Sequence, residues 1–114
     1  VSTAASSFGY IGIPQVSTAT GLTLGVNYVG KHIYTTATGQ THTIAANSAS
    51  SLEIGATFVF INPAGVTTSI AINTDTLILA GPGTTGTRTL APYGMATAVK
   101  ITSTSWMISG NGLT

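Results

Sequence analysis

The sequence predicts an all-β fold, an antiparallel β-sandwich or jelly-roll-like knob, and three observations support that class. Charged side chains make up 4% of the 114 residues, whereas about a quarter of an ordinary globular domain is charged. Serine and threonine are spread among β-branched apolar residues, a composition that suits the surface of a pleated sheet. Short segments of period-2 alternation are separated by Gly, Pro, Asn and Ser, and no helical period of 3.6 residues stands out.

The alternating segments are the predicted strands, and each is bounded by turn residues. Residues 67–72 illustrate the pattern, because Ile70 and Ile72 alternate with Ser69 and Ala71 and so give the strand one core face. Residues 95–101 alternate in the same way. The full set of predicted strands is 8–13, 22–27, 31–35, 41–45, 52–54, 57–61, 67–72, 76–79, 87–90, 95–101 and 105–109.

Residues 57–61 differ from the others because they are apolar on both faces. In a domain of this size, such a strand lies between two sheets or has its second face covered by another copy of the chain. The shortage of charge favours another copy, since charged residues are depleted at interface cores and normally protect sheet edges from pairing. We therefore expect a homo-oligomer.

Turn residues place the predicted chain reversals. In Asn62-Pro63-Ala64-Gly65 the proline fixes φ and the glycine tolerates positive φ, which predicts a hairpin between the strands 57–61 and 67–72. A second hairpin is predicted at residues 102–104. Residues 80–86 hold glycines at 81, 83 and 86 and a proline at 82, so they are predicted to form a loop.

Length and composition bound the organisation of the chain. We expect one domain over residues 1–114, with a core in 30–114 and N-terminal strands or a linker-like arm in 1–29. The chain has no cysteine, which removes a disulfide framework and a zinc–thiolate site. A net charge of +1 gives little attraction for nucleic acid, and the longest apolar runs are too short to span a membrane. The start at Val1, without Met or a signal peptide, suggests an excised module or a processed product.

Several segments occur together in an order that resembles a C-terminal module of tailed-bacteriophage fibre and appendage proteins. The resemblance covers nearly the whole chain apart from residues 16–29. It implies a trimeric β-rich knob on the phage particle surface, whose partners are other virion proteins and a host cell-surface glycan or protein. The segments are residues 10–15 (YIGIPQ), 30–34 (GKHIY), 43–48 (TIAANS), 54–62 (IGATFVFIN), 75–77 (DTL), 83–90 (GTTGTRTL) and 106–114 (WMISGNGLT).

Three classes of function remain open. The first is a trimeric fibre or tail-appendage tip that takes part in host-surface attachment, and the second is an architectural capsid-decoration or assembly domain. The third is an enzyme or a free-standing carbohydrate-binding module. The chain offers few titratable groups for acid–base work and no Gly-x-Ser-x-Gly nucleophile elbow. We therefore predict no catalytic residues, no cofactor and no bound metal.

Binding residues are expected in loops, because a rigid sheet carries variable loops to partners. The candidate loops are 36–40, 47–51 and 80–86, and the candidate contacts are Gln40, Asn47, Arg88 and Tyr93. Arg88 has two interpretations: its guanidinium binds a carboxylate of a ligand, or it pairs with Asp75 or Glu53 within one subunit or between subunits.

The remaining residues with binding chemistry each have a structural alternative. A metal site on His32 or His42 needs a further ligand from Glu53, Asp75 or a symmetry mate; otherwise His32 packs beside Tyr34, and His42 lies on a polar sheet face between Thr41 and Thr43. Trp106 is either a sugar-stacking platform or a core residue. The Thr-x-Thr pairs resemble the arrays of ice-binding solenoids, but their irregular spacing argues against a solenoid.

Overall fold

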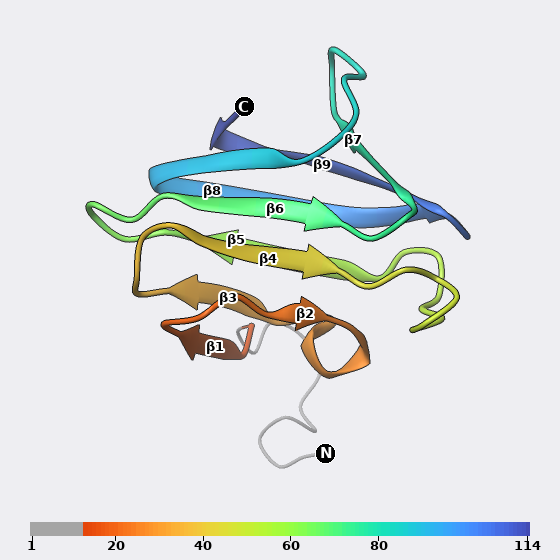
Figure 1. Cartoon of the computed structure of the whole chain (residues 1–114), viewed down its shortest axis with the longest axis horizontal. Helices are drawn as coiled ribbons and strands as arrows, with labels where there is room; N and C mark the ends of the chain where they lie inside the picture. The colour runs from red at the N-terminus through yellow and green to blue at the C-terminus, as the bar shows by residue number, and fades with distance from the viewer. Residues whose placement is uncertain (1–12) are drawn as a thin grey trace.

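The computed structural model describes residues 13–114, which form one curled sheet of nine strands (Figure 1). The described part of the chain contains no α-helix, and its one helical turn is the 3₁₀ segment η2 (Val26–Tyr28). The predicted all-β class is therefore confirmed. The strands are β1 (Gln15–Thr18), β2 (Thr23–Leu24), β3 (His32–Thr35), β4 (Gln40–Ile44), β5 (Thr57–Ile61), β6 (Thr68–Ile72), β7 (Thr76–Leu79), β8 (Arg88–Thr102) and β9 (Ser105–Leu113).

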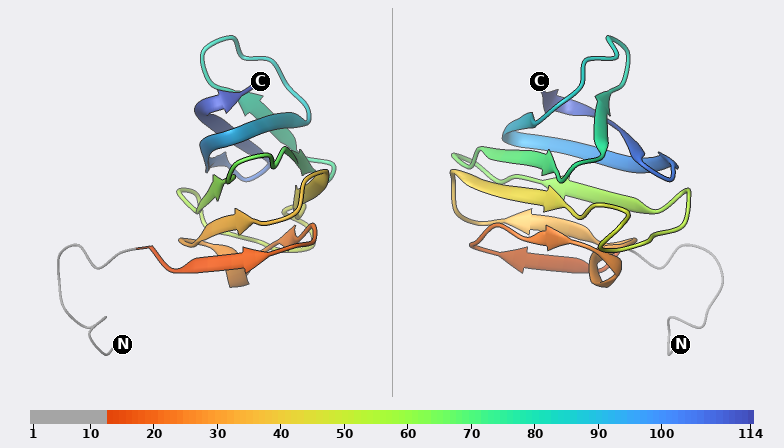
Figure 2. Two further views of the ribbon diagram at one scale, coloured as in Figure 1. Left: turned by 90° about the vertical axis from the view of Figure 1, so that its left-hand side faces the viewer. Right: turned by 45° about the vertical axis from the view of Figure 1, so that its right-hand side comes forward.

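The first six strands alternate between two limbs of this sheet. The sheet order is β1-β3-β5-β8-β6-β4-β2, so β1, β3 and β5 form one limb and β2, β4 and β6 form the other. Within each limb, neighbouring strands run parallel. The β2-β4-β6 limb lies in front in Figure 1, and the turned views in Figure 2 show the sheet curling between the limbs. Residues 15–72 thus form three stacked rungs of a short parallel coil.

This arrangement corrects the expected antiparallel topology, because the strands within each limb run parallel. Period-2 alternation is the same in parallel and antiparallel strands, so the pattern of residues did not distinguish the two pairings. The rungs also differ in length. His32 pairs with Gln15, 17 positions earlier, and with Val59, 27 positions later. Rungs of unequal length leave no fixed sequence period to detect.

β8 closes the end of the coil by pairing with both limbs. Residues 88–90 pair antiparallel with β6, and residues 95–99 pair antiparallel with β5. β9 then pairs antiparallel with β8, and β7 runs parallel to β9. The predicted strands 87–90 and 95–101 are accordingly two parts of one bent strand.

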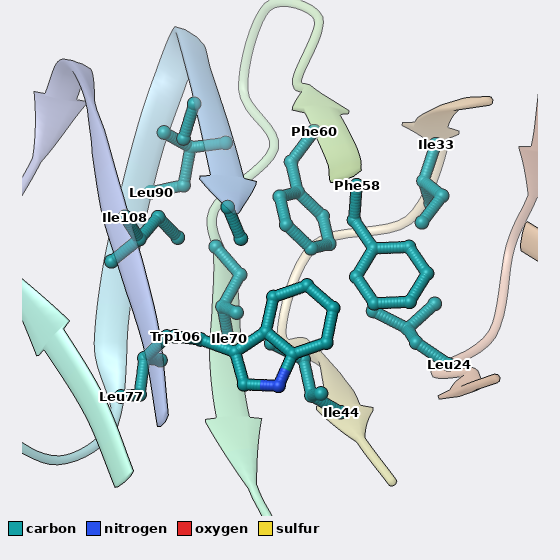
Figure 3. Packing of buried hydrophobic residues seen from close by; sticks show 12 residues of the cluster. Leu24, Ile33, Ile44, Phe58, Phe60, Ile70, Leu77, Leu90, Trp106 and Ile108 are labelled. Carbon is teal, nitrogen blue, oxygen red and sulfur yellow. The ribbon is translucent and has the colours of Figure 1, made fainter. Parts of the chain in front are cut away.

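The core lies on the inner side of the curl (Figure 3). On β8 the alanine side points inward, since Ala96 and Ala98 are buried whereas Met95 on the other side is 55% exposed. Trp106 is 1% exposed, which confirms the core alternative for this residue. The buried cluster is Leu24, Ile33, Ile44, Phe58, Phe60, Ile70, Leu77, Leu90, Ala96, Ala98, Trp106 and Ile108.

Most predicted strands match observed ones, and the differences lie near the N-terminus and in one loop. The predicted strands 57–61 and 76–79 coincide with β5 and β7. Residues 52–54 lie in the β4–β5 loop and form no strand, and the predicted strand 22–27 is replaced by the short β2 and η2. The predicted strand 8–13 lies outside the described residues except for Ile13, which is not in a strand.

The N-terminal part of the described chain joins the same sheet as the rest. β1 lies at one end of the strand order and β2 at the other. Leu24 in β2 is fully buried in the common core. From residue 15 onward, the segment expected as N-terminal strands or an arm is therefore part of the coil.

One predicted hairpin is confirmed and the other is wrong. β8 and β9 form the hairpin predicted at residues 102–104, with Thr102 opposite Ser105. The chain also turns at Asn62-Pro63-Ala64-Gly65, where Gly65 has a φ of 73°. However, β5 and β6 on either side of this turn belong to different limbs and do not pair with each other. The turn residues fixed a reversal of the chain, but the partner of each strand lies elsewhere in the sequence.

Candidate binding surface

Four chain reversals stack along one side of the coil, and together they form a surface that we call the turn edge. They are residues 18–21, 36–39, 63–67 and 91–94, along the left-hand side of Figure 1. Backbone hydrogen bonds join them. Thr36 N donates to Thr18 O at 2.8 Å, and Gly39 N donates to Thr67 O at 2.8 Å. The strand ladders thus continue into the turns and hold these turns in register.

Polar side chains fix the backbone of the turn edge. Thr36 Oγ1 donates to Thr18 O at 3.2 Å, and Thr38 Oγ1 accepts from Thr67 N at 3.0 Å. Gln40 Oε1 accepts from Gly21 N at 3.1 Å. The result is an uncharged surface of hydroxyl, amide and backbone groups with defined positions.

Tyr93 projects from this edge at the bend of β8. Its side chain is 78% exposed, and its φ is 60°. A left-handed backbone is unfavourable for a bulky side chain and costs on the order of 1–3 kcal/mol. Such a residue persists only when its surroundings determine its conformation, and strained residues cluster at functional sites.

Asn62 fixes the conformation of this bend through buried hydrogen bonds. It is 3% exposed, and its Nδ2 donates to Leu90 O at 2.9 Å and more weakly to Ala91 O at 3.4 Å. Its backbone N donates to Gly94 O at 3.0 Å, and its side chain also bonds the hydroxyl of Thr68. One buried amide therefore holds both ends of residues 90–94.

Gly94 allows the bend to close tightly. A Cβ at this position would lie 2.7 Å from Ala91 O and 2.7 Å from Leu90 Cδ1. Since real Cβ contacts are longer than this, only glycine fits next to Tyr93. The exposed ring is thus presented by a rigid support.

Of the four predicted contacts, the structure brings two to the turn edge. Tyr93 projects from it, and Gln40 begins β4 there, opposite Thr68, which in turn pairs with Leu90. Gln40 is half-buried and its amide oxygen supports the neighbouring turn. The candidate loop 36–40 lies at the same edge, whereas residues 80–86 form the expected loop, which projects beyond the sheet at the top of Figure 1.

Arg88 lies at the base of this projecting loop. Its Nε donates to Gly86 O at 3.2 Å and to Thr87 O at 3.0 Å. Asp75, one of the two predicted ion-pair partners, instead accepts a hydrogen bond from Asn47 N at 2.8 Å. Within residues 13–114, the two side chains thus have different partners.

Asn47 belongs to the opposite end of the coil, where it anchors the β4–β5 loop. Its Oδ1 accepts from Lys100 Nζ at 2.8 Å, and the same ammonium donates to Leu52 O at 2.8 Å. Lys100 is 2% exposed, and its backbone also bonds Gly55 N and Ala56 O. Asn47 therefore has a structural role, and so does its loop.

A pocket of about 530 Å³ opens beside this anchored loop. Its walls are mainly apolar, from Val26, Val29, Leu52 and Ile54, and Glu53 contributes the one carboxylate among the lining residues. The loop that forms it is fixed by Lys100. The pocket shares no residue with the turn edge.

His42 is fully buried, which corrects the expectation that it lies on a polar face between Thr41 and Thr43. It points to the core with Ile44, and its ring stacks on Phe60 with centroids 6.0 Å apart. Nδ1 accepts from Leu22 N at 3.2 Å, so Nε2 carries the proton and donates to Thr35 Oγ1 at 2.7 Å. Burial lowers the pKa of His42 below its usual value of 6.5.

His32 lies on the outer side of β3, where its Nε2 accepts from Gln15 Nε2 at 3.2 Å. It is 10 positions from His42 in sequence and on the opposite face of the sheet. Within residues 13–114, no group of three His, Asp or Glu side chains is close enough to hold a metal ion.

The sequence did not identify two buried side chains, Asn62, which holds the bend at the turn edge, and Lys100, which holds the β4–β5 loop. Asn62 was predicted only as a turn residue, because asparagine before proline favours a turn and does not show that the amide is buried. Lys100 lies on the same side of β8 as Ala96 and Ala98, and its charge is typical of a side that faces solvent. Nothing in the local pattern indicates that this side faces the core.

Comparison with protein-family models, with curated proteins and with solved structures found no match for this chain. Among the described residues, no helix has the length and apolar character needed to cross a membrane.

Proposed function

We propose that this chain is a non-catalytic structural module of a tailed-bacteriophage virion, a homotrimeric fibre or tail-appendage tip that takes part in attachment to the host surface. The turn edge is its ligand-binding surface, and Tyr93 is its principal contact. The ligand is a cell-surface glycan, which a neutral surface of hydroxyls and one exposed aromatic ring suits well. The virion assignment rests on the sequence resemblance.

The observation that carries the binding role is the conformation of Tyr93. The ring is 78% exposed on a residue with a φ of 60°, an unfavourable backbone that Asn62 and Gly94 hold in place. The support from Asn62 and Gly94 keeps the ring in one place before the ligand arrives. A contact that is preorganised in this way loses little conformational entropy on binding.

The distribution of titratable groups supports a non-catalytic role. The Asp75 carboxylate accepts a hydrogen bond from the backbone N–H of Asn47. The Lys100 ammonium donates hydrogen bonds to Asn47 and Leu52. His42 is buried in the core, where its two ring nitrogens bond Leu22 and Thr35.

The test compares Tyr93→Asn with wild-type protein in binding to glycan arrays and to bacterial cells. Asparagine tolerates positive φ, so this variant removes the ring and keeps the bend. We expect binding to fall at least about tenfold, which corresponds to about 1.4 kcal/mol. Ser103→Asn, at an exposed position in the β8–β9 hairpin at the other end of β8, is the matched control and should bind normally.

Unchanged binding by Tyr93→Asn would disprove the role of the turn edge. If wild-type protein bound neither cells nor glycans but decorated assembled particles, the architectural capsid-decoration function would replace attachment.

A further inference from the structure

The two ends of the coil differ in how their outermost strands are covered. At the upper end in Figure 1, the projecting loop folds back along the outer edge of β7. Leu79 N donates to Thr84 O at 2.8 Å, and Gly86 N donates to Leu77 O at 3.0 Å. At the lower end, β1 and β2 are the outermost strands, and within the described part of the chain neither pairs with a strand on its outer side. We call these two unpaired edges the open end.

The hydrogen bonds of β1 show which of its backbone groups face outward. The carbonyl oxygens of Pro14 and Thr18 accept hydrogen bonds from the backbone of β3 and of the residue after it, at 3.0 Å and 2.8 Å. Successive residues of a strand direct their backbone groups to opposite sides, so the even-numbered residues bond β3. The N–H and C=O groups of Gln15 and Ser17 therefore point away from β3, and both residues are exposed.

β2 is arranged in the same way. The carbonyl oxygens of Leu22 and Leu24 accept from Thr43 N at 2.8 Å and from Ala45 N at 3.0 Å, so these residues face β4. Thr23 lies between them and is exposed, and its backbone groups point to the outer side. Together with the two outward residues of β1, the open end presents three N–H and three C=O groups.

The open end lacks most of the features that prevent strand addition. Natural sheets protect their edges with charged side chains, proline, bulges or a covering loop. The first charged residue in the sequence is Lys31, which precedes β3, one strand in from the edge. Pro14 lies before β1 and not within it, and the pairings of β1 and β2 contain no bulge. Only the shortness of these strands, with four and two residues, limits pairing.

Apolar side chains lie on the inner side of these edges. Val16 and Leu22 pack against the core but remain half-buried, whereas Leu24 is fully buried. The exposed side chains of β1, Gln15 and Ser17, are polar and uncharged. A strand added here would therefore cover Val16 and Leu22 with one of its faces and extend an uncharged polar surface with the other.

We infer that the open end binds an extended polypeptide segment of another protein, which adds a strand to β1 and β2 and continues the coil. The free N–H and C=O groups select an extended chain, since such a chain offers the complementary groups at the same spacing. The segment alternates apolar and uncharged polar residues, to match the two sides of the edge. It pairs with both strands, because β1 alone offers the groups of only two residues.

The other end of the coil argues against further copies of this chain as the occupant. A second copy cannot continue the coil head to tail, because the projecting loop already pairs with the outer edge of β7. Two copies could join only by their open ends, and the experiment separates this arrangement from binding of a different protein. The inference goes beyond the proposed function and does not depend on glycan binding at the turn edge.

The experiment uses a blocked, fluorescently labelled octapeptide of alternating threonine and valine, and fluorescence anisotropy measures its binding to the full chain. A second peptide has the same side chains but is N-methylated at two adjacent central residues, so neither of its edges can pair normally. We expect wild-type protein to bind the unmethylated peptide and to bind the methylated one at least about tenfold more weakly.

Ser17→Pro tests the same edge from the side of the protein. Proline removes the outward N–H of this residue and places its ring at the edge, while the bonds to β3 come from the neighbouring residues. We expect peptide binding to fall at least about tenfold. Ser17→Ala is the matched control, because it removes only the hydroxyl, and it should bind the peptide as wild type does.

Amide hydrogen exchange of the wild-type protein is a second measurement that needs no variant. The amides of Ser17 and Thr23 should exchange rapidly without the peptide and more slowly with it. The amide of Val16 faces β3 and should be the slower one in both conditions.

Strand addition would be overturned if wild type bound neither peptide or both equally, or if Ser17→Pro and Ser17→Ala weakened binding to the same extent. Slow exchange of Ser17 without peptide would also overturn the inference. A dependence of that slow exchange on protein concentration would assign the open end to a second copy, and no dependence would assign it to the same chain. Cell binding that still depends on Tyr93 in any of these cases would leave the attachment function intact.

Discussion

Phe58 and Trp106 stack on each other across β8, with ring centroids 5.0 Å apart and ring planes 17° apart. They come from β5 and β9, the two strands that flank residues 95–99 of β8, and the residue opposite Phe58 on β8 is Ala98. Figure 3 shows the two rings at the centre of the core. The small side chain of Ala98 leaves the space in which these rings meet.

Enlarging Ala98 should therefore overpack the core. We expect Ala98→Val to lower the free energy of unfolding by about 1–3 kcal/mol, because the aromatic pair has to move. Urea unfolding followed by the fluorescence of the single tryptophan measures this change at a fixed protein concentration. The matched control is Ala71→Val on the half-buried outer side of β6, which should stay within about 0.5 kcal/mol of wild type. Equal effects at the two positions would show that no such tight packing exists at Ala98.

The buried state of His42 predicts a loss of stability in acid. Its folded-state pKa is lowered, so the unfolded chain binds the proton more readily. The neutral ring contributes fully to the free energy of unfolding above the unfolded-state pKa of about 6.5. This contribution is lost as the pH falls toward the lower folded-state pKa. Urea unfolding between pH 7.5 and pH 5 should show stability declining, with a slope of at most about 1.4 kcal/mol per pH unit for this proton.

His42→Gln is the corresponding variant, because its amide still accepts a hydrogen bond and donates one but does not titrate. We expect it to be less stable than wild type at pH 7.5 and to lose less stability on acidification. The same pH slope in both proteins would assign the dependence to other groups.

Removal of the Asn62 side chain should weaken both the fold and the presentation of Tyr93. Asn62→Ala leaves the carbonyl of Leu90 and the hydroxyl of Thr68 without this partner, at a cost of about 1–3 kcal/mol. Binding to cells should also fall, although Tyr93 is unchanged. Asn73→Ala, at an exposed position after β6, is the control and should be near neutral in both assays. If the destabilised Asn62→Ala protein bound cells as well as wild type, the Asn62 amide would not be needed for binding by Tyr93.

Lys100→Met should release the β4–β5 loop. The variant keeps much of the side-chain length but loses the hydrogen bonds to Asn47 Oδ1 and Leu52 O. Hydrogen bonds to charged groups contribute about 1.5–3 kcal/mol each, partly offset here by the cost of burying the ammonium. We expect a net destabilisation of about 1–3 kcal/mol and faster amide hydrogen exchange in residues 47–56. Lys31→Met is the control, and faster exchange in this loop for both variants would argue against a specific anchor.

The sequence predicted the exposed residue of the candidate site, Tyr93, but not the buried Asn62 that holds it in place. Tyr93 follows Pro92 and precedes Gly94, and this local sequence was enough to predict a loop-like position for an aromatic contact. Its positive φ depends on the buried Asn62, which is 31 positions earlier in the chain. Asn47 was chosen by the same loop criterion, yet it is bound to Lys100, 53 positions away. Loop residues that contact ligands and loop residues that anchor the loop have the same composition, and only the long-range partner separates them.

The sequence by itself determined the all-β class, the positions of β5 and β7, the β8–β9 hairpin and the loop 80–86. Each depends on side-chain alternation or turn chemistry within a few neighbouring residues. The tertiary structure decided that β5 pairs with β3 and β8 and not with β6, that β8 bends to join the two limbs, and that the Ala96 side of β8 faces the core. The alternation of apolar and polar residues shows that a strand has two different faces, but it does not show which strand will lie beside it. That choice depends on packing between residues far apart in the chain, here the aromatic rings that need the space over Ala98.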